Sequence, residues 1–283
     1  MMAKISTMHF EIRDALKTAD ECFLCVLERN LDEKYAEHYL YEQVMDPESR
    51  AAIVASRGFC NYHFYALLRE ARKPDGTDGQ GLALIMESIT QALISDIEEQ
   101  RGLRGIVGPT ESRAARLNFI LREIKSHLVH PSKEKHLVFE ESARKMFSLR
   151  ESCPACSHVY RFISIYLGDF IEELNNGNQE IVELFKASKG LCMPHYAAIM
   201  YSIDEKLAES RKGVVAQQVI EVQLQNIERL NAELAEYGRK QDYRFSHEPW
   251  GTEKDAVPRG VAKLAGMMGV KTTTELDCKL FWS

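Results

Sequence analysis

One pattern of cysteine and histidine occurs twice in the sequence, and this repeat constrains the chain more than any other feature. In the first copy, Cys22-Phe-Leu-Cys25 is followed after 34 residues by Cys60-Asn-Tyr-His63. In the second copy, Cys153-Pro-Ala-Cys156 is followed after 35 residues by Cys192-Met-Pro-His195. Equivalent positions lie 131 residues apart in the first pair and 132 apart in the second pair. Such agreement indicates an internal duplication.

The repeated residues predict two metal sites. Two cysteines three positions apart can direct both sulfurs at one ion where the backbone turns, and a second pair then completes a tetrahedron. We therefore expect each copy to bind an ion with its own three cysteines and one histidine. The predicted ligands are Cys22, Cys25, Cys60 and His63 in the first copy, and Cys153, Cys156, Cys192 and His195 in the second.

Zn²⁺ is the cofactor that this ligand set favours, with one ion in each site. Three thiolates and an imidazole fill its four positions, which leaves none for water or substrate and argues against hydrolysis there. Structural zinc contributes about 10 to 16 kcal/mol of apparent folding energy, as much as the stability of a whole domain. An iron-sulfur cluster held by the same ligands is an alternative, because a sequence does not distinguish the two. Buried cysteines without a metal would rarely repeat at all four positions.

Apolar residues around the motifs follow a helical period. Over 159–174 they are spaced by alternating steps of three and one, which places them along one face of a helix. The segments between the paired ligands end in Gly58 and Gly190, each a candidate helix cap. Long helices are expected over 81–100 and 214–237, the latter with an inward-facing seam of Ile220, Leu224, Ile227, Leu230 and Leu234. We predict an all-α protein of two helical repeats, each stapled by a Cys3His metal site.

The duplication divides the chain into four parts. They are the first repeat over 1–101, a helical connector over 102–150, the second repeat over 151–240, and a C-terminal tail over 241–283. Pro249 and Trp250 lie in the tail within Glu248-Pro-Trp-Gly-Thr-Glu-Lys-Asp255, and a helix is expected over 256–268. We expect Trp250 to dock on a helix of the same chain, with a protein partner as the alternative.

The connector is strongly basic in an acidic protein. Between Arg101 and Arg150 there are 11 Lys and Arg against five Asp and Glu, whereas the whole chain has a formal net charge of −6. Such a segment either pairs with acidic helices of the same chain, which we favour, or contacts nucleic acid. Binding to nucleic acid would weaken steeply as the salt concentration rises.

The chain has no apolar run that approaches the roughly 20 residues of a membrane span. Its N-terminal residues carry scattered charges and lack the apolar core of a secretory signal. We therefore expect a cytoplasmic protein that contacts no membrane. In a reducing cytoplasm, paired cysteines favour metal ligands over disulfides. The sequence indicates neither a particular protein partner nor an oligomeric state.

These motifs together resemble a known family. Glu21-Cys-Phe-Leu-Cys25, Gly58-Phe-Cys-Asn-Tyr-His63, both second-copy pairs and the tail segment from Glu248 to Asp255 are similar to a prokaryotic family catalogued as domain of unknown function 6062. The resemblance spans most of the chain, from Asp20 to Gly266. It implies a cytoplasmic, mostly helical protein with duplicated Cys/His pairs and no assigned activity.

The sequence therefore predicts a zinc-binding helical scaffold or regulatory protein without catalysis. The alternative is a redox- or metal-responsive protein, whose thiolates release zinc on oxidation or hold an iron-sulfur cluster. An enzyme with its active site in the cleft between the repeats would require a pocket of converging polar groups. No hydrolase or kinase motif occurs in the sequence.

Overall fold

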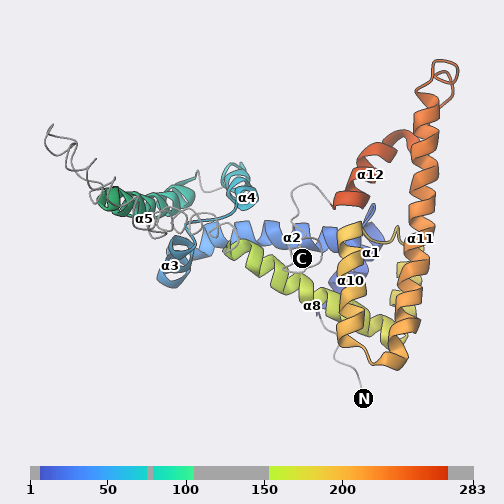
Figure 1. Cartoon of the computed structure of the whole chain (residues 1–283), viewed down its shortest axis with the longest axis horizontal. Coiled ribbons are helices and arrows are strands. Elements are labelled where there is room, and N and C mark those ends of the chain that lie inside the picture. Colours follow the sequence, from blue (N-terminus) through green and yellow to red (C-terminus); the bar gives the residue numbers. More distant parts are fainter. Residues whose placement is uncertain (1–6, 75–78, 105–152, 267–283) are drawn as a thin grey trace, which may run out of the picture. The chain divides into compact units, whose positions relative to one another are not determined.

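The computed structural model describes residues 7–74, 79–104 and 153–266, and every regular element in these ranges is a helix (Figure 1). This confirms the predicted all-α class. The elements are α1 (Thr7–Thr18), α2 (Phe23–His38), the π-helical turn η1 (Tyr39–Gln43), α3 (Pro47–Ala55), α4 (Asn61–Ala71), α5 (Gln80–Arg104), α8 (Pro154–Asn176), α9 (Gln179–Ala187), α10 (Met193–Lys206), α11 (Glu209–Lys240), the 3-10 helix η2 (Thr252–Asp255) and α12 (Ala256–Ala265). Throughout the described part, each helix is too short or too polar to traverse a lipid bilayer.

The compact units of the chain differ from the copies of the sequence. Among the described residues, the first unit contains 7–35 and 156–266, and the second unit contains 36–74, 79–104 and 153–155. The expected repeats, 1–101 and 151–240, therefore each contribute residues to both units. The boundaries fall within α2 and at the start of α8.

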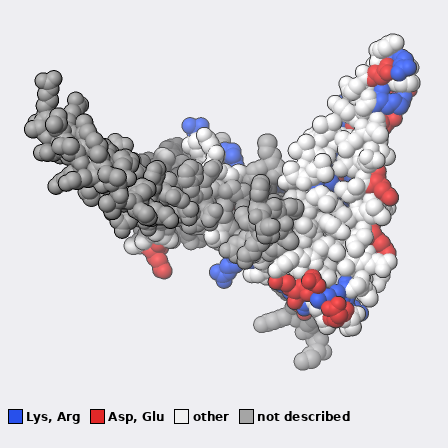
Figure 2. All heavy atoms as spheres, viewed as in Figure 1, with Lys and Arg blue, Asp and Glu red and all other residues white. Residues whose placement is uncertain are grey.

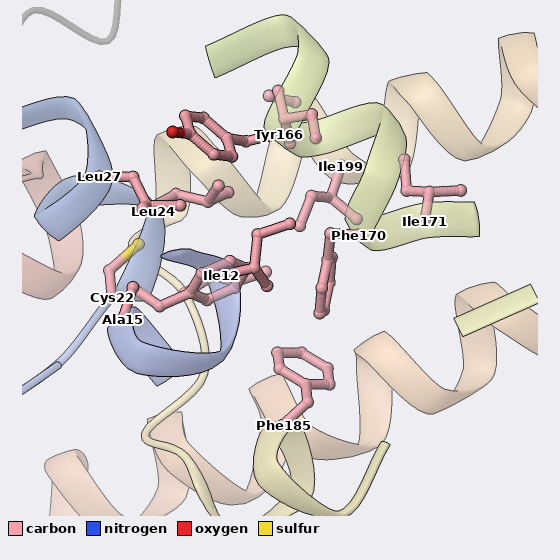
Figure 3. Packing of buried hydrophobic residues seen from close by; sticks show 14 of the residues in the cluster. Ile12, Ala15, Cys22, Leu24, Leu27, Tyr166, Phe170, Ile171, Phe185 and Ile199 are labelled. Atoms are coloured by element: carbon pink, nitrogen blue, oxygen red, sulfur yellow. The ribbon is translucent and has the colours of Figure 1, made fainter. Parts of the chain in front are cut away.

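The core of the first unit includes α2 and α8, which pack antiparallel. The Phe23 ring lies 4.9 Å from the Phe170 ring, whereas Tyr35, further along α2, lies 5.1 Å from His158 near the start of α8. Phe170 in turn meets Phe185 of α9 edge to face, with 5.0 Å between ring centroids (Figure 3). The apolar stripe predicted over 159–174 lines this core.

Helix α1 also contributes to this core, although the sequence patterns did not predict it. Ile12, Ala15 and Leu16 are buried, and Ile12 lies among the labelled side chains of the core in Figure 3. The three residues have the i, i+3, i+4 spacing of a helix face, which was the available signal.

Helices α10, α11 and α12 complete the first unit. α11 packs against α10, and α12 folds back against both (Figure 1). The seam predicted on α11 is wrong at Ile220 and Leu224, which are 42% and 56% exposed. The buried face instead includes the polar residues Gln223 and Asn226. These side chains form hydrogen bonds to backbone groups of the turn before α10, which explains why polar residues occupy part of the buried face.

The second unit is built on α5, which packs against η1, α3 and α4. α3 begins at Pro47 because the carboxylate of Asp46 caps its N-terminus by accepting a hydrogen bond of 2.7 Å from the Ser49 N–H. The buried apolar side chains of this unit include Tyr39, Leu40, Val44, Ile53, Phe59, Leu67, Leu82, Ile85 and Ile89.

Candidate metal centres

All four Cys/His pairs lie at helix N-termini, as the sequence indicated. Cys60 and Cys192 are the N-cap residues of α4 and α10, while Cys22 and Cys153 immediately precede α2 and α8. The second member of each pair lies one helical turn further along, so both side chains can face the same point. The partial positive charge of a helix N-terminus favours thiolates at these positions.

The first candidate centre, site 1, combines Cys22, Cys25, Cys192 and His195 in the first unit. The four ligand atoms lie within 4.8 Å of one another, and all four residues are buried. The Sγ atoms of Cys25 and Cys192 are 3.6 Å apart, which is too far for a disulfide. His195 Nδ1 lies 3.5 Å from the Sγ atoms of both Cys22 and Cys25. It lies 3.2 Å from Cys192 Sγ.

The second candidate centre, site 2, combines Cys60, His63, Cys153 and Cys156, whose ligand atoms also lie within 4.8 Å of one another. His63 Nδ1 lies 3.1 Å from Cys60 Sγ and 3.5 Å from Cys153 Sγ. Cys60, His63 and Cys153 are buried, whereas Cys156 is partly exposed. Both groups thus offer three sulfurs and one imidazole nitrogen, as predicted for two Cys3His sites.

The ligand pairs are exchanged between the sequence copies. Cys22 and Cys25 meet the Cys-x-x-His pair of the second copy, and Cys153 and Cys156 meet that of the first. The prediction that each repeat closes its own site is therefore wrong. The 16 residues of α2 and five of η1 advance the chain by about 30 Å, whereas the nine residues of α3 advance it by only about 14 Å. α3 by itself therefore does not span the length of α2 and η1.

The atoms of site 1 have the spacing of a tetrahedral site for one ion. Zn–S bonds of about 2.3 Å and a Zn–N bond of about 2.0 Å imply about 3.8 Å between sulfurs and about 3.5 Å between sulfur and nitrogen. The separations of 3.6 Å between the Sγ atoms of Cys25 and Cys192 and of 3.5 Å from Cys22 Sγ to His195 Nδ1 are close to these values, whereas Cys192 Sγ lies nearer to Nδ1, at 3.2 Å.

The charges of site 1 also favour a cation. Burial opposes a thiolate at Cys22, but hydrogen bonds from Cys192 and Cys25 lower the pKa of Cys22 well below its usual value. Contact with Cys22 raises the pKa of Cys192 in turn. Burial lowers the pKa of His195, but the Cys22 thiolate outweighs burial and raises it. The lowered pKa of Cys22 and the raised pKa of His195 both favour a negatively charged sulfur beside a positive charge. A divalent ion would displace the remaining protons.

Glu28 lies on the far side of His195 from the sulfurs. Glu28 is 4% exposed, and its Oε2 lies 3.5 Å from His195 Nε2. Because Nδ1 faces the thiolates, this carboxylate favours the proton on Nε2 and leaves the Nδ1 lone pair for an ion. Sequence reasoning missed Glu28. The available signal was an acidic residue within the apolar helix face of Leu24 and Leu31.

A glycine with positive φ precedes each Cys-x-x-His pair, as the capping pattern predicted. Gly58 has φ 103° and Gly190 has φ 73°. In the second unit, Arg57 holds this turn to α5 through two hydrogen bonds to Asp96, of 2.6 and 2.8 Å. In the first unit, the Gln223 amide both accepts from and donates to the Leu191 backbone, at 3.0 Å in each direction. Each turn is thus fixed to the long helix that follows it.

A cluster of charged side chains lies next to site 1. Glu21, which precedes Cys22, is 4% exposed, and its carboxylate lies 2.9 Å from Arg229 and 3.3 Å from Arg259. Glu233 pairs with both arginines. Lys263 Nζ lies 3.1 Å from the Glu21 carboxylate. We call Glu21, Arg229, Glu233, Arg259 and Lys263 the Glu21 cluster. Sequence reasoning missed it because its members come from three distant segments.

The tail residue Trp250 docks on a helix of its own chain, as expected. Its ring lies 5.4 Å from the Tyr237 ring on α11. Figure 2 shows basic and acidic side chains together at the end of α11, where Arg239 pairs with Glu236 and Glu248. The expected helix over 256–268 is α12, which ends at Ala265. The basic connector over 102–150 lies almost entirely outside the described residues, so its predicted roles stay predictions.

The first unit also contains a cavity of about 200 Å³ between α1, α2 and α8, away from the candidate ligands. Its polar lining includes Glu11, Lys34 and Tyr166. The Glu11 carboxylate accepts hydrogen bonds from Tyr166 and, at 3.2 Å, from Lys34. These polar groups pair with one another, and the cavity is smaller than the roughly 300 Å³ of typical ligand pockets. It gives no support to an enzyme active site.

Comparison with known proteins places the chain in a family without assigning an activity. A family model described as "Family of unknown function (DUF6062)" matches residues 1–271. No curated protein and no solved structure matches the chain. The resemblance noted from the motifs is therefore confirmed over nearly the whole sequence. This chain, with its two crossed Cys3His groups, belongs to the DUF6062 family of unknown function.

Proposed function

We propose that the protein is a helical scaffold held together by two structural zinc ions, one at each Cys3His group. The crossed arrangement of the ligand pairs carries this proposal, because each ion would join the start of one sequence copy to the middle of the other. Each ion would contribute about 10 to 16 kcal/mol of apparent folding energy, enough to decide whether the helices assemble.

The donor set favours a structural ion over a catalytic one. Zn²⁺ supplies a charge of +2 that allows three thiolates to remain buried together. Cys22, Cys25 and Cys192 would bind as thiolates, and Glu28 would hold the proton of His195 at Nε2. The four donors complete the coordination, so no position remains for substrate. A reducing cytoplasm is the compartment we propose, since the ligand thiols must stay reduced.

Metal analysis of the full chain tests this proposal. Anaerobically purified protein should be colourless, contain two zinc ions per chain, and lose its cooperative melting transition when a strong chelator removes them. Brown protein with inorganic sulfide would show an iron-sulfur protein instead. A chain without metal that melts cooperatively and is unaffected by chelator would overturn the metal proposal.

A redox-responsive role is a second candidate, supported by the partial exposure of Cys156. An oxidant could reach this sulfur more easily than the buried ligands, and oxidation of one thiolate would weaken zinc binding. Dilute hydrogen peroxide should then release the ion of site 2 while the ion of site 1 is retained. Release of both ions at one rate, or of neither before unfolding, would contradict this role.

A further inference from the structure

Helix α12 carries a lysine that is completely buried beside site 1. Lys263 is 0% exposed. Its Nζ donates a hydrogen bond of 2.9 Å to the Glu21 carbonyl oxygen and another to the Lys189 carbonyl oxygen, and lies 3.1 Å from the Glu21 carboxylate. Two carbonyl oxygens thus accept hydrogen bonds from this amino group, and the Glu21 carboxylate lies beside it as the counter-charge. Burial lowers the pKa of Lys263, and the Glu21 carboxylate opposes this effect.

The acceptors of Lys263 belong to the backbone segments that lead into the two ligand pairs of site 1. Glu21 immediately precedes Cys22, and Lys189 lies three residues before Cys192. These segments come from different copies of the sequence. A single side chain thus hydrogen-bonds to the backbone shortly before each of the two ligand pairs of site 1.

The charge of Lys263 complements a metal centre. A divalent ion with three thiolates and a neutral imidazole has a formal charge of −1. The carboxylate of Glu21 is a further negative charge directly beside this centre. A buried cation requires anionic or strongly polar partners, and Lys263 has both.

The tail motif holds α12 in this position. Glu253 accepts hydrogen bonds from the Gly251 N–H at 2.8 Å and from Lys240 at 2.5 Å. Lys240 also donates to the Pro249 carbonyl oxygen at 2.7 Å. These contacts tie the turn of Glu248-Pro-Trp-Gly-Thr-Glu-Lys-Asp255 to the end of α11, and Arg259 then pairs α12 with Glu21 and Glu233.

We propose that residues 248–266 form a clamp for site 1, and that Lys263 is the positioning residue through which the clamp retains the metal ion. This inference rests on the proposed zinc-binding function. The clamp holds Cys22 and Cys192 in position relative to each other, because it fixes the backbone before each of them. Release of α12 therefore speeds the loss of the ion from site 1 and leaves site 2 unaffected.

Zinc release from the loaded full-length protein tests the clamp. An excess of a chromogenic chelator should remove the two ions in two phases of one equivalent each. Lys263→Met, which removes the ammonium group and keeps most of the side-chain volume, should speed one phase by about 10- to 100-fold, matching the loss of metal affinity that is usual when a residue supporting the metal ligands is removed. Glu28→Gln should accelerate the same phase, which identifies it as site 1.

Lys254→Met is the matched control, because Lys254 belongs to the same segment but its side chain is exposed and contributes none of the contacts described above for the clamp. It should leave both phases at the wild-type rate. Glu253→Gln is a second variant, which loosens the tail motif without touching the groups around Lys263. It should also speed the site 1 phase, and it carries the test if Lys263→Met does not fold.

Hydrogen exchange in α12 distinguishes the outcomes. Faster exchange of the α12 amides in Lys263→Met or Glu253→Gln, together with unchanged zinc release, would overturn the clamp. Equal acceleration of both phases would overturn it too, since the effect would then be general. Wild-type protein that binds no zinc would instead contradict the proposed function itself.

Discussion

Sites 1 and 2 share one set of donor atoms but have different surroundings. In site 1 all four residues are buried, Glu28 faces the histidine, and the Glu21 cluster lies alongside. In the sequence of the second copy, Val159 stands at the position of Glu28 and Ser152 at that of Glu21. Cys156 of site 2 is partly exposed. The duplication thus repeats the donor atoms but not these two neighbouring side chains, so stability and reactivity can differ between two sites of the same composition.

The largest effect that we predict concerns which residues share an ion. Cys22→Ser with Cys192→Ser should remove one zinc ion, because both residues belong to site 1. Cys22→Ser with Cys60→Ser should remove both ions and most of the folded structure, since each lost ion costs about 10 to 16 kcal/mol. Zinc content and far-ultraviolet circular dichroism measure these outcomes. If Cys22→Ser with Cys192→Ser lost both ions and Cys22→Ser with Cys60→Ser lost only one, the ligand pairs would instead combine within each copy.

The glycines before the two Cys-x-x-His pairs should differ in sensitivity. A Cβ atom on Gly58 would lie 2.6 Å from Phe64 Cζ and 3.1 Å from Ile89 Cδ1, whereas one on Gly190 would lie 3.0 Å from Gln223 Oε1. Both positions also have positive φ, which strains other residues by about 1 to 3 kcal/mol. Gly58→Ala should therefore lower the urea midpoint more than Gly190→Ala. A larger loss for Gly190→Ala would show that the turn of the first unit is the tighter one.

The carboxylate beside His195 should affect one site only. Glu28→Gln keeps the size of the side chain but weakens its hold on the Nε2 proton, so zinc should leave site 1 about 10 to 100 times faster. Release from site 2 should not change. Glu33→Gln on the exposed face of α2 is the control. If Glu28→Gln leaves both rates at the wild-type value, the carboxylate does not support the metal ligand.

The smallest effect is expected at the turn before α4. Asp96→Ala removes the partner of Arg57, and an ion pair that is partly open to solvent contributes about 1 kcal/mol or less. The melting temperature of the second unit should fall slightly, with the zinc of site 1 retained. Asp242→Ala, which breaks the more exposed pair with Arg244, should change stability less. A greater loss from Asp242→Ala would mean that the Arg57 pair does not stabilise the turn.

Local sequence patterns predicted the elements of this fold well. The helical stripe over 159–174, the long helices and the two glycine turns all follow from short-range spacing, because a helix repeats every 3.6 residues. The pattern failed on α11, where Ile220 and Leu224 are exposed. Gln223 and Asn226 occupy the inward face there, since their amides satisfy backbone groups of another segment. A hydrogen bond between distant segments leaves no trace in the spacing of apolar residues.

The sequence by itself determined the helical class, the eight candidate ligands and their position at helix starts, because each depends on residues close together in the chain. Only the tertiary structure decided which ligand pairs meet. The antiparallel packing of α2 and α8 brings the start of each of these helices to the Cys-x-x-His pair of the other copy. The tertiary structure likewise places Glu28 beside His195 and Lys263 beside Glu21. These contacts join residues up to 242 positions apart, and they arise from packing rather than from any repeating pattern.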